Sequence, residues 1–455
     1  MPERHLGRQP HPEAPPPREA QTMSPDARCR PSSREDEGGH TTGAAGKSGA
    51  GFAALLAATF VVFLGYGTVL PILPLFLDRV LAVTTSGDVS LHTGLLTGVY
   101  TLALFGFAPL WGSLSDRLGR RPVLLWGLAG FALAMLGFSL TRNLPLAYGV
   151  RALAGAFAAA VIPVALAQAA ECDDATLRAR RFAWLSATAT LGFLSGPMLS
   201  GWLASIPMVM PQSDMVLGGP VAWPFVATAG FAAGVWLLTY HHVREQPVQR
   251  SSSDAPASEP ASPRAVGGFL ALTLLAMLGL GAFEVGLSLQ GRQSIGLNPF
   301  KVGLLFTECS LVMLAVQLLW SAHPPKGLTP GHLIGGAFLL MAMGILGLPY
   351  ASGFWQAVVV VALLGAGSGL LIPLLAYQVS LASGPAQGAA LGKQTALSSL
   401  GQAVGSAGAG LLFVGSALGT YWGLAIVLFV TAILTFVIHY HPRVIAMVSH
   451  TPRQD

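Results

Sequence analysis

Two apolar runs, residues 94–111 and 122–140, flank a ten-residue segment that reads GSLSDRLGRR, Gly112–Arg121. Each run is long enough to cross a bilayer, because the hydrocarbon core takes about 20 helical residues. Only 10% of the chain is charged and its mean hydropathy is +0.61, whereas ordinary soluble domains are about 25% charged. Since Lys and Arg resist translocation, the Arg-rich turn is typical of a cytoplasmic loop in a polytopic membrane protein.

Twelve apolar runs follow residue 50, which predicts an all-α membrane protein with twelve transmembrane helices in two six-helix repeats. The longest hydrophilic interruption follows the sixth run and indicates a flexible linker. Residues 1–50 have no apolar period and indicate a disordered tail. The expected organisation is a cytoplasmic tail (1–50), a six-helix bundle (51–243), a cytoplasmic linker (244–266), a second six-helix bundle (267–441) and a cytoplasmic tail (442–455). The runs cover 54–77, 94–112, 122–141, 144–170, 182–205, 221–241, 267–290, 302–321, 332–350, 354–380, 389–415 and 419–440.

An internal repeat supports the two-bundle organisation. Gly94–Leu96 precedes Trp111 by the same spacing that separates Gly303–Leu305 from Trp320. The dipeptide Ile162-Pro163 in the fourth run also matches Ile372-Pro373 in the tenth, at nearly the same offset. A shared offset across the linker indicates a duplicated six-helix unit, as in parallel-repeat transporters.

The distribution of Lys and Arg predicts that both termini are cytoplasmic. With that orientation the tails, the linker and the inner loops carry most of the basic residues. The outer loops carry Arg79, Arg142, Arg292 and Lys301, and Arg151 lies within a span.

The loop pattern G-x-L-x-D-R-x-G-R-R resembles the signature loop of the major facilitator superfamily, between transmembrane helices 2 and 3. The resemblance implies solute transport by alternating access. It also implies that Asp116 faces the positive N-terminal end of helix 11 and latches the outward-open state. The alternative is that this loop is only a basic topological anchor. The implied gating latch comprises Gly112, Asp116, Arg117, Gly119, Arg120, Arg121 and Glu171.

Two further motifs resemble those of antiporters in this superfamily. The fifth span carries Gly192, Gly196, Pro197 and Gly201 in the pattern G-x-x-x-G-P-x-x-S-G, with Ser200 in place of a glycine. The first span carries Gly65, Pro71 and Pro74, as in the helix 1 motif of twelve-helix drug:proton antiporters. The alternative is that the fifth-span glycines only allow close helix packing.

Three costly charges lie inside spans: Arg151, Glu284 and Glu308. At a rise of about 1.5 Å per residue, all three lie roughly 9–10 Å below the outer face. Burial favours a neutral carboxyl and a nearby Arg favours an ionised one, so we expect a proton-coupling site, with Glu308 as the stronger candidate. Arg151 with Gly155 also resembles the family's helix 4 motif, which is linked to proton transfer. The alternatives are a structural ion pair and an Arg that extends to the interface.

These features predict a proton-coupled efflux carrier for a small lipophilic or amphipathic solute in a bacterial inner membrane. The chain is expected to be a monomer with no enzymatic activity, no cofactor, no metal and no nucleic-acid partner. Two alternatives are a symporter or facilitator for uptake of a sugar or organic acid, and a non-transporting receptor on the same fold. Helices 1, 4, 7 and 10 are expected to line the cavity, with Tyr66, Tyr100, Phe157, Gln168, Phe283, Tyr377 and Gln378 as substrate-contacting candidates.

Overall fold

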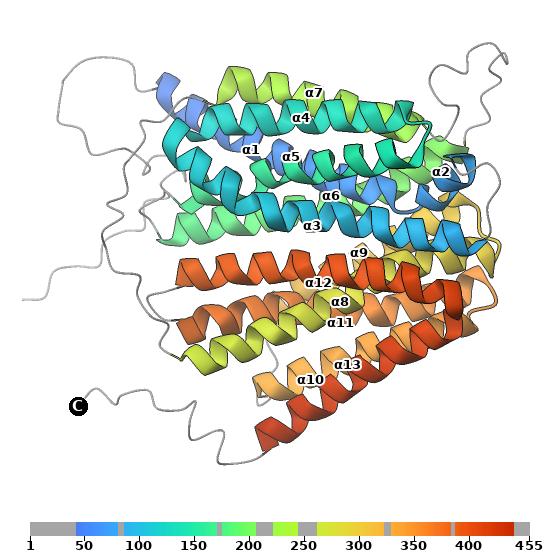
Figure 1. The fold of residues 1–455 in the computed structure, drawn as a ribbon. Coiled ribbons are helices and arrows are strands. Elements are labelled where there is room, and N and C mark those ends of the chain that lie inside the picture. The colour runs from blue at the N-terminus through green and yellow to red at the C-terminus, as the bar shows by residue number, and fades with distance from the viewer. Residues whose placement is uncertain are drawn as a thin grey trace, which may run out of the picture.

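The computed structural model describes residues 42–80, 86–170, 175–205, 222–243, 262–322, 329–383 and 387–440. In these ranges the regular elements are helices, and no strand is present (Figure 1). They are α1 (Thr42–Val69), α2 (Leu73–Val80), α3 (Ser86–Leu118), α4 (Arg120–Leu140), α5 (Leu144–Ala170), α6 (Ala175–Ser205), α7 (Trp223–His242), α8 (Pro263–Gln293), α9 (Pro299–Ala322), α10 (Pro330–Gly347), α11 (Phe354–Ser383), α12 (Gln387–Gly415) and α13 (Ala417–Tyr440), with a 3₁₀ turn at Leu348–Tyr350.

Each of the twelve predicted spans contains one long helix, and the first span also includes the start of the short helix α2. Eleven of the long helices are apolar enough to cross a membrane by length and composition. The exception is α6, whose interior from Ser186 to Gly201 contains many Ser, Thr and Gly residues. It is as long as its neighbours and packs between α1 and α9, so it completes the twelve-helix arrangement.

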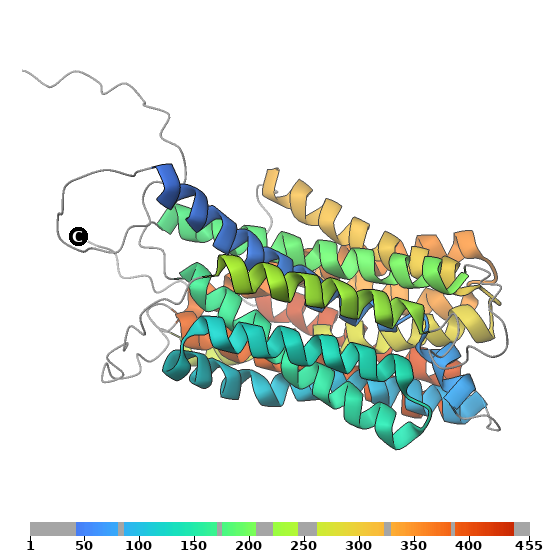
Figure 2. The same cartoon turned by 90° about the horizontal axis from the view of Figure 1, so that it is seen from above.

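The helices divide into two groups along the chain. Helices α1 to α7 pack mainly on one another, and so do α8 to α13. Figure 1 shows these groups as two bundles that lie side by side, and Figures 1 and 2 show their helices running in similar directions. The bundles meet through α3 with α12, α6 with α9, and the α1–α2 segment with α8.

Several predicted boundaries need correction. Helix α1 begins at Thr42, inside the predicted tail, and α8 begins at Pro263, inside the predicted linker. Both helices begin before the apolar residues from which they were predicted, because helical backbone hydrogen bonds also form in the polar sequence that precedes those residues. The remaining tails and most of the linker lie outside the described residues.

The first predicted span, 54–77, is not one helix. Helix α1 ends at Val69, and Pro71 lies in the turn that follows. Proline has no N–H to donate and its ring clashes with the preceding turn, so it ends the helix. Pro74 lies in the first turn of α2, where a missing N–H costs nothing.

Helix α2 covers one end of the first bundle, with Phe76 stacked on Phe138. We call this the α2 end and the opposite one the Gly119 end.

Small residues bring the two bundles into backbone contact toward the α2 end. A Cβ atom added to Gly94 of α3 would lie 2.6 Å from the Cα of Gly410 of α12. A Cβ atom on Gly303 of α9 would lie 2.4 Å from the carbonyl oxygen of Pro197 of α6. Since real Cβ contacts are never this short, these positions tolerate glycine only, and the bundles touch main chain to main chain.

The fifth-span motif lies in this packing. A Cβ atom on Gly192 would lie 2.4 Å from the Phe60 carbonyl oxygen, and one on Gly196 would lie 2.4 Å from that of Leu64. One turn further, Gly201 faces Pro299 of the other bundle. The motif thus packs α6 against α1 within its own bundle and against α9 across the bundle interface.

We predict that Gly196→Leu severely destabilises the protein. Its Cβ would lie 2.4 Å from the Leu64 carbonyl oxygen and 2.8 Å from the Thr68 nitrogen, and overpacking typically costs about 1–3 kcal/mol. Thermal unfolding of the purified protein should show a large fall in Tm. Gly230→Leu is the matched control, because no atom lies within 4 Å of the Cβ position there. Equal Tm values for the two variants would contradict this packing.

Candidate functional site

A cavity of about 370 Å³ lies between the bundles. The α3 residues that line the cavity begin at Tyr100, just after Gly94 and Gly98, which contact α12. The α12 residues that line it lie between Thr395 and Gln402. It therefore lies on the Gly119 side of the backbone contacts. Its lining comprises Val62, Phe63, Tyr66, Tyr100, Thr101, Leu104, Ile162, Ala189, Thr190, Phe193, Met277, Leu280, Phe283, Glu284, Phe306, Cys309, Ser310, Met313, Gln317, Ile372, Thr395, Ser398, Ser399 and Gln402.

The cavity is closed toward the α2 end. Tyr66, Tyr100 and Glu284 are buried, whereas Thr395 on the Gly119 side is exposed.

The prediction that the helices now called α1, α5, α8 and α11 line the cavity holds for α1 and α8. Helices α5 and α11 each contribute one residue, Ile162 and Ile372. These isoleucines belong to the repeated Ile-Pro dipeptides, so equivalent positions of the two repeats meet at one cavity.

Glu284 of α8 is the carboxyl in this cavity, and it connects the two bundles. Its side chain is 1% exposed. The Tyr66 hydroxyl of α1 donates to Glu284 Oε2 at 2.5 Å. Gln402 Nε2 of α12 donates to Glu284 Oε1 at 3.0 Å and to the Tyr66 oxygen at 3.1 Å. Hydrogen bonds to a carboxylate are among the stronger ones, so this triad is a polar connection across the bundle interface.

Arg151 of α5 lies next to this triad but does not contact Glu284. It is fully buried, and its Nε donates to the Leu96 carbonyl oxygen at 3.4 Å. The guanidinium carbon is 4.3 Å from the Tyr100 ring centroid and 5.9 Å from that of Tyr66. Aromatic faces attract cations, so the two tyrosines hold the charge, and Tyr66 lies between Arg151 and Glu284.

Glu308 lies elsewhere, which corrects the prediction of one cluster of three charges. On α9 the cavity-lining residues are Phe306, Cys309, Ser310, Met313 and Gln317. With 3.6 residues per turn, Glu308 points to the opposite face of the helix. Leu311 and Leu318 on that face are more than half exposed. Equal depth along a helix axis does not fix the rotation about it, and for this reason the prediction was wrong.

Three of the seven predicted substrate-contacting residues line the cavity: Tyr66, Tyr100 and Phe283. Phe157 packs instead over Gly130 of α4, where an added Cβ atom would lie 2.3 Å from its ring. Tyr377 is 60% exposed, and neither Gln168 nor Gln378 is in the lining.

The sequence reasoning missed the polar residues of α12. Thr395, Ser398, Ser399 and Gln402 all line the cavity. The sequence pattern that could have identified them is their spacing of three and four residues within an apolar run, because this spacing places them on one helix face.

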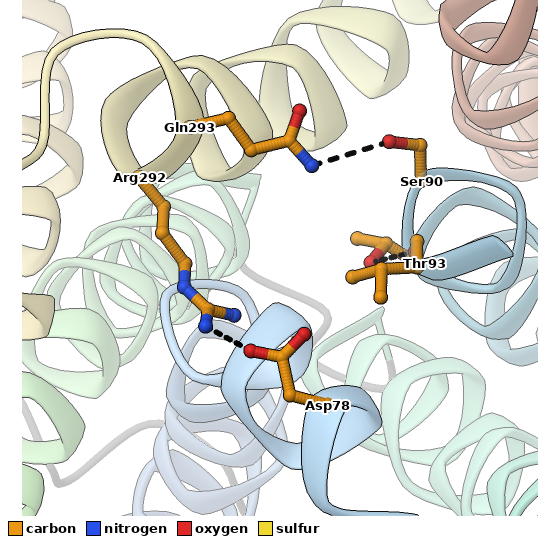
Figure 3. A network of polar contacts seen from close by, with 6 residues as sticks. Asp78, Ser90, Thr93, Arg292 and Gln293 are labelled. Carbon is orange, nitrogen blue, oxygen red and sulfur yellow. Dashed lines mark hydrogen bonds and ion pairs between the residues drawn. The ribbon is translucent and has the colours of Figure 1, made fainter. Parts of the chain in front are cut away.

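Polar contacts continue from Glu284 to the α2 end along one face of α8. Four residues beyond Glu284, the Ser288 hydroxyl lies 2.9 Å from both the Leu70 carbonyl oxygen and the Glu284 carbonyl oxygen of its own helix, so its one proton is shared between them. Four residues further, Arg292 forms an ion pair with Asp78 of α2. Figure 3 shows this pair and, beside it, Gln293 donating to Ser90 of α3. We call the Tyr66–Glu284, Leu70–Ser288 and Asp78–Arg292 contacts the outer ladder.

The loop predicted to be a latch forms a tight turn between α3 and α4. Gly119 has a φ of +92°, which favours glycine, whereas Gly112 is not crowded. Arg121 donates to the Tyr240 carbonyl oxygen at 2.9 Å and lies 5.2 Å from that ring centroid. This contact joins the loop to α7 of the same bundle. Of the other latch residues, Glu171 and the side chain of Asp116 lie outside the described part of the chain.

Gly65 of the helix 1 motif lies at a close helix contact. A Cβ atom there would lie 2.5 Å from the Phe131 ring and 3.0 Å from Thr228. Helix α1 is thus packed closely on α4 and α7, which fixes the position of Tyr66, its next residue.

A family model described as Major Facilitator Superfamily matches residues 55–323, more than half of the chain. The chain belongs to this superfamily. It is therefore a multi-pass membrane transporter of a small molecule and not an enzyme. This confirms the resemblance stated from the helix 2–3 loop and the predicted all-α architecture.

Two curated relatives are similar over most of their length. Quinolone resistance protein NorA of Staphylococcus aureus (strain MSSA476) is 25% identical over 359 residues, covering 78% of this chain and 87% of the relative. Multidrug resistance protein 2 of Bacillus subtilis (strain 168) is 26% identical over 370 residues, covering 80% and 88%. The chain thus shares extended sequence similarity with a quinolone resistance protein and a multidrug resistance protein.

Solved structures of other transporters show the same fold. The human organic anion transporter MFSD10 (TETRAN) is 20% identical with a TM-score of 0.62, covering 85% of this chain and 99% of that one. A D-xylose-proton symporter is 15% identical with a TM-score of 0.66, covering 84% and 96%.

We predict that Asp78→Asn loosens the α2 end, because it removes the charge that pairs with Arg292. An exposed ion pair contributes roughly 0–1 kcal/mol, so opening at this end should become up to about fivefold more frequent. A cysteine placed at buried Ser90, in a chain whose native cysteines are replaced, should react correspondingly faster with a charged maleimide. The double variant Asp78→Arg/Arg292→Asp should restore the slow rate; an unchanged rate in Asp78→Asn would show that the pair does not hold this end.

Proposed function

We propose that this protein is a proton-coupled antiporter that exports a small amphipathic solute, with Glu284 as the site that binds proton and solute in turn. The observation that carries this proposal is the position of Glu284. It is the only charged residue among the described residues that line the cavity, and it bonds across the bundle interface. The similarity to NorA and Multidrug resistance protein 2 supports export.

The proposed orientation places the Gly119 end in the cytoplasm of a bacterial cell, with both termini on that side. The loop at Gly119 carries Arg117, Arg120 and Arg121, and basic loops are retained inside. In this orientation the structure has its outer end closed and its cavity toward the cytoplasm. The solute would therefore enter from the inside in the state described.

The geometry suggests how exchange would proceed. In this state the carboxyl accepts hydrogen bonds from Tyr66 and Gln402, as a carboxylate does without a proton of its own. A solute that donates to Glu284 competes with Tyr66 and weakens the cross-bundle connection. Opening the outer end then requires breaking the outer ladder. A proton that binds Glu284 from the outside would release the solute and permit the return.

We predict that Glu284→Gln abolishes coupling, because Gln keeps the size of the side chain but cannot ionise. In proteoliposomes, an imposed pH difference should drive uphill flux of ethidium, a flat aromatic cation, by the wild type and not by this variant. Glu308→Gln is the matched control and should transport like the wild type, since Glu308 lies outside the cavity lining.

Other outcomes would assign another role. Loss of coupling in Glu308→Gln alone would transfer the proton site to that residue. Flux driven in the same direction as the proton gradient would indicate symport, and flux independent of it would indicate a facilitator. Substrate binding without any flux would indicate a receptor.

We also propose that the Gly112–Arg121 loop latches the outward-open state through Asp116. Asp116→Asn should leave the amount of protein in the membrane unchanged but cut export sharply, because a fixed charge that complements a helix N-terminus is lost. Efflux is compared in cells that contain equal amounts of both forms. The anchor alternative depends only on the basic residues of the loop, so under it Asp116→Asn leaves export unchanged.

A further inference from the structure

Three hydroxyl residues of α12 form one wall of the cavity. Thr395, Ser398 and Ser399 precede Gln402 at spacings of three and four residues, so they share a helix face. Together with Gln402, they extend that wall from the exposed side of the cavity to Glu284. The antiport mechanism proposed above uses only the Glu284 end of this wall.

These hydroxyls offer acceptors to the cavity. Thr395 donates to the Leu391 carbonyl oxygen at 3.0 Å, Ser398 to that of Gln394 at 2.9 Å, and Ser399 to that of Thr395 at 3.3 Å. A hydroxyl has one proton and two lone pairs. With each proton bonded to its own helix, the oxygen can only accept from a ligand.

The other Ser and Thr hydroxyls of the cavity follow the same pattern, whereas the Tyr66 hydroxyl donates to Glu284. Thr101, Thr190 and Ser310 each donate to a carbonyl oxygen of their own helix. The Gln402 amide is bonded to Tyr66 and Glu284. Among the described residues of the lining there is no Lys, Arg or His. The cavity is therefore rich in acceptors, and a carboxylate solute would find few donors there.

Aromatic residues of the first bundle form another wall of the cavity. The Tyr66 ring stacks with Tyr100 at 5.2 Å and with Phe193 at 5.9 Å between centroids. All three residues line the cavity together with Phe63. A flat aromatic solute would lie against this wall with one edge directed at α12. The volume of about 370 Å³ lies within the usual range for drug-sized ligands.

We propose that Thr395, Ser398 and Ser399 determine specificity by accepting hydrogen bonds from N–H groups on the edge of an aromatic monocation whose charge lies at Glu284. This proposal rests on the proposed function. It adds that the carrier distinguishes solutes by the N–H groups on the edge of the aromatic ring system, and not by charge and lipophilicity alone. The acceptor wall and the aromatic wall come from different bundles, so a solute of this kind spans the interface that must move.

The test compares two ligands that differ only in edge donors. Ethidium carries two aromatic amino groups, and its desamino counterpart, 5-ethyl-6-phenylphenanthridinium, carries none. Affinities are measured by titration of the purified full-length protein in nanodiscs. One neutral hydrogen bond corresponds to about 2- to 10-fold in affinity, so the wild type should bind ethidium at least several-fold more tightly.

The double variant Ser398→Ala/Ser399→Ala should reduce the ethidium preference toward one while leaving the affinity for the desamino compound unchanged. Ser368→Ala is the matched control. Ser368 of α11 also donates to its own helix, to the Leu364 carbonyl oxygen at 2.9 Å, but it is not in the cavity lining. Thr395→Val, which keeps the side-chain shape, should lower the preference in the same direction.

The proposal is overturned by equal affinities in the wild type, by a preference that survives the double variant, or by failure of the wild type to bind either compound. The proposed function is judged separately. If the wild type pumps both compounds equally under a pH difference, antiport stands and the specificity role of α12 is wrong. If the double variant loses the desamino compound as well, the hydroxyls have a structural role.

Discussion

The main-chain contact between the two bundles is the constraint on which the rest of the structure depends. Gly94 against Gly410, and Gly303 against Pro197, allow helices of different bundles to approach with no side chain between them. In a bilayer such packing stabilises helix pairs without a hydrophobic driving force, because lipid tails are as apolar as the side chains they replace. Because these contacts lie toward one end, the bundles are held there, and the space between them remains on the other side.

That asymmetry gives Glu284 its significance. A carboxyl inside a membrane protein is costly unless it is paired or hydrogen-bonded, and here its partners belong to both bundles. Arg151 is held separately by the faces of Tyr66 and Tyr100. Tyr66 therefore contacts both charged groups, one through its hydroxyl and the other through its ring. A change at the carboxyl is transmitted to the first bundle through a single side chain.

The helices were predictable because a membrane imposes length and composition on each of them. The break after α1 was missed because Ile72, Leu73 and Leu77 continue the apolar run past Pro71. The helical backbone, in contrast, cannot continue through this proline. The site was only partly predictable. Hydropathy located Glu284 and Glu308 along their helices equally well, but only neighbouring helices fix which face points inward. The α12 wall was missed because Ser and Thr bonded to their own backbone hardly interrupt an apolar pattern.

The outer ladder has a consequence for the environment in which the carrier operates. Its innermost contact, at Glu284, is buried, whereas the Asp78 and Arg292 side chains are 40% and 34% exposed. The Debye length is about 8 Å at physiological ionic strength and shortens as salt rises. In the proposed orientation, salt outside the cell would therefore screen the outermost contact without reaching the innermost one. The balance between inward-facing and outward-facing forms would then depend on external salinity as well as on acidity.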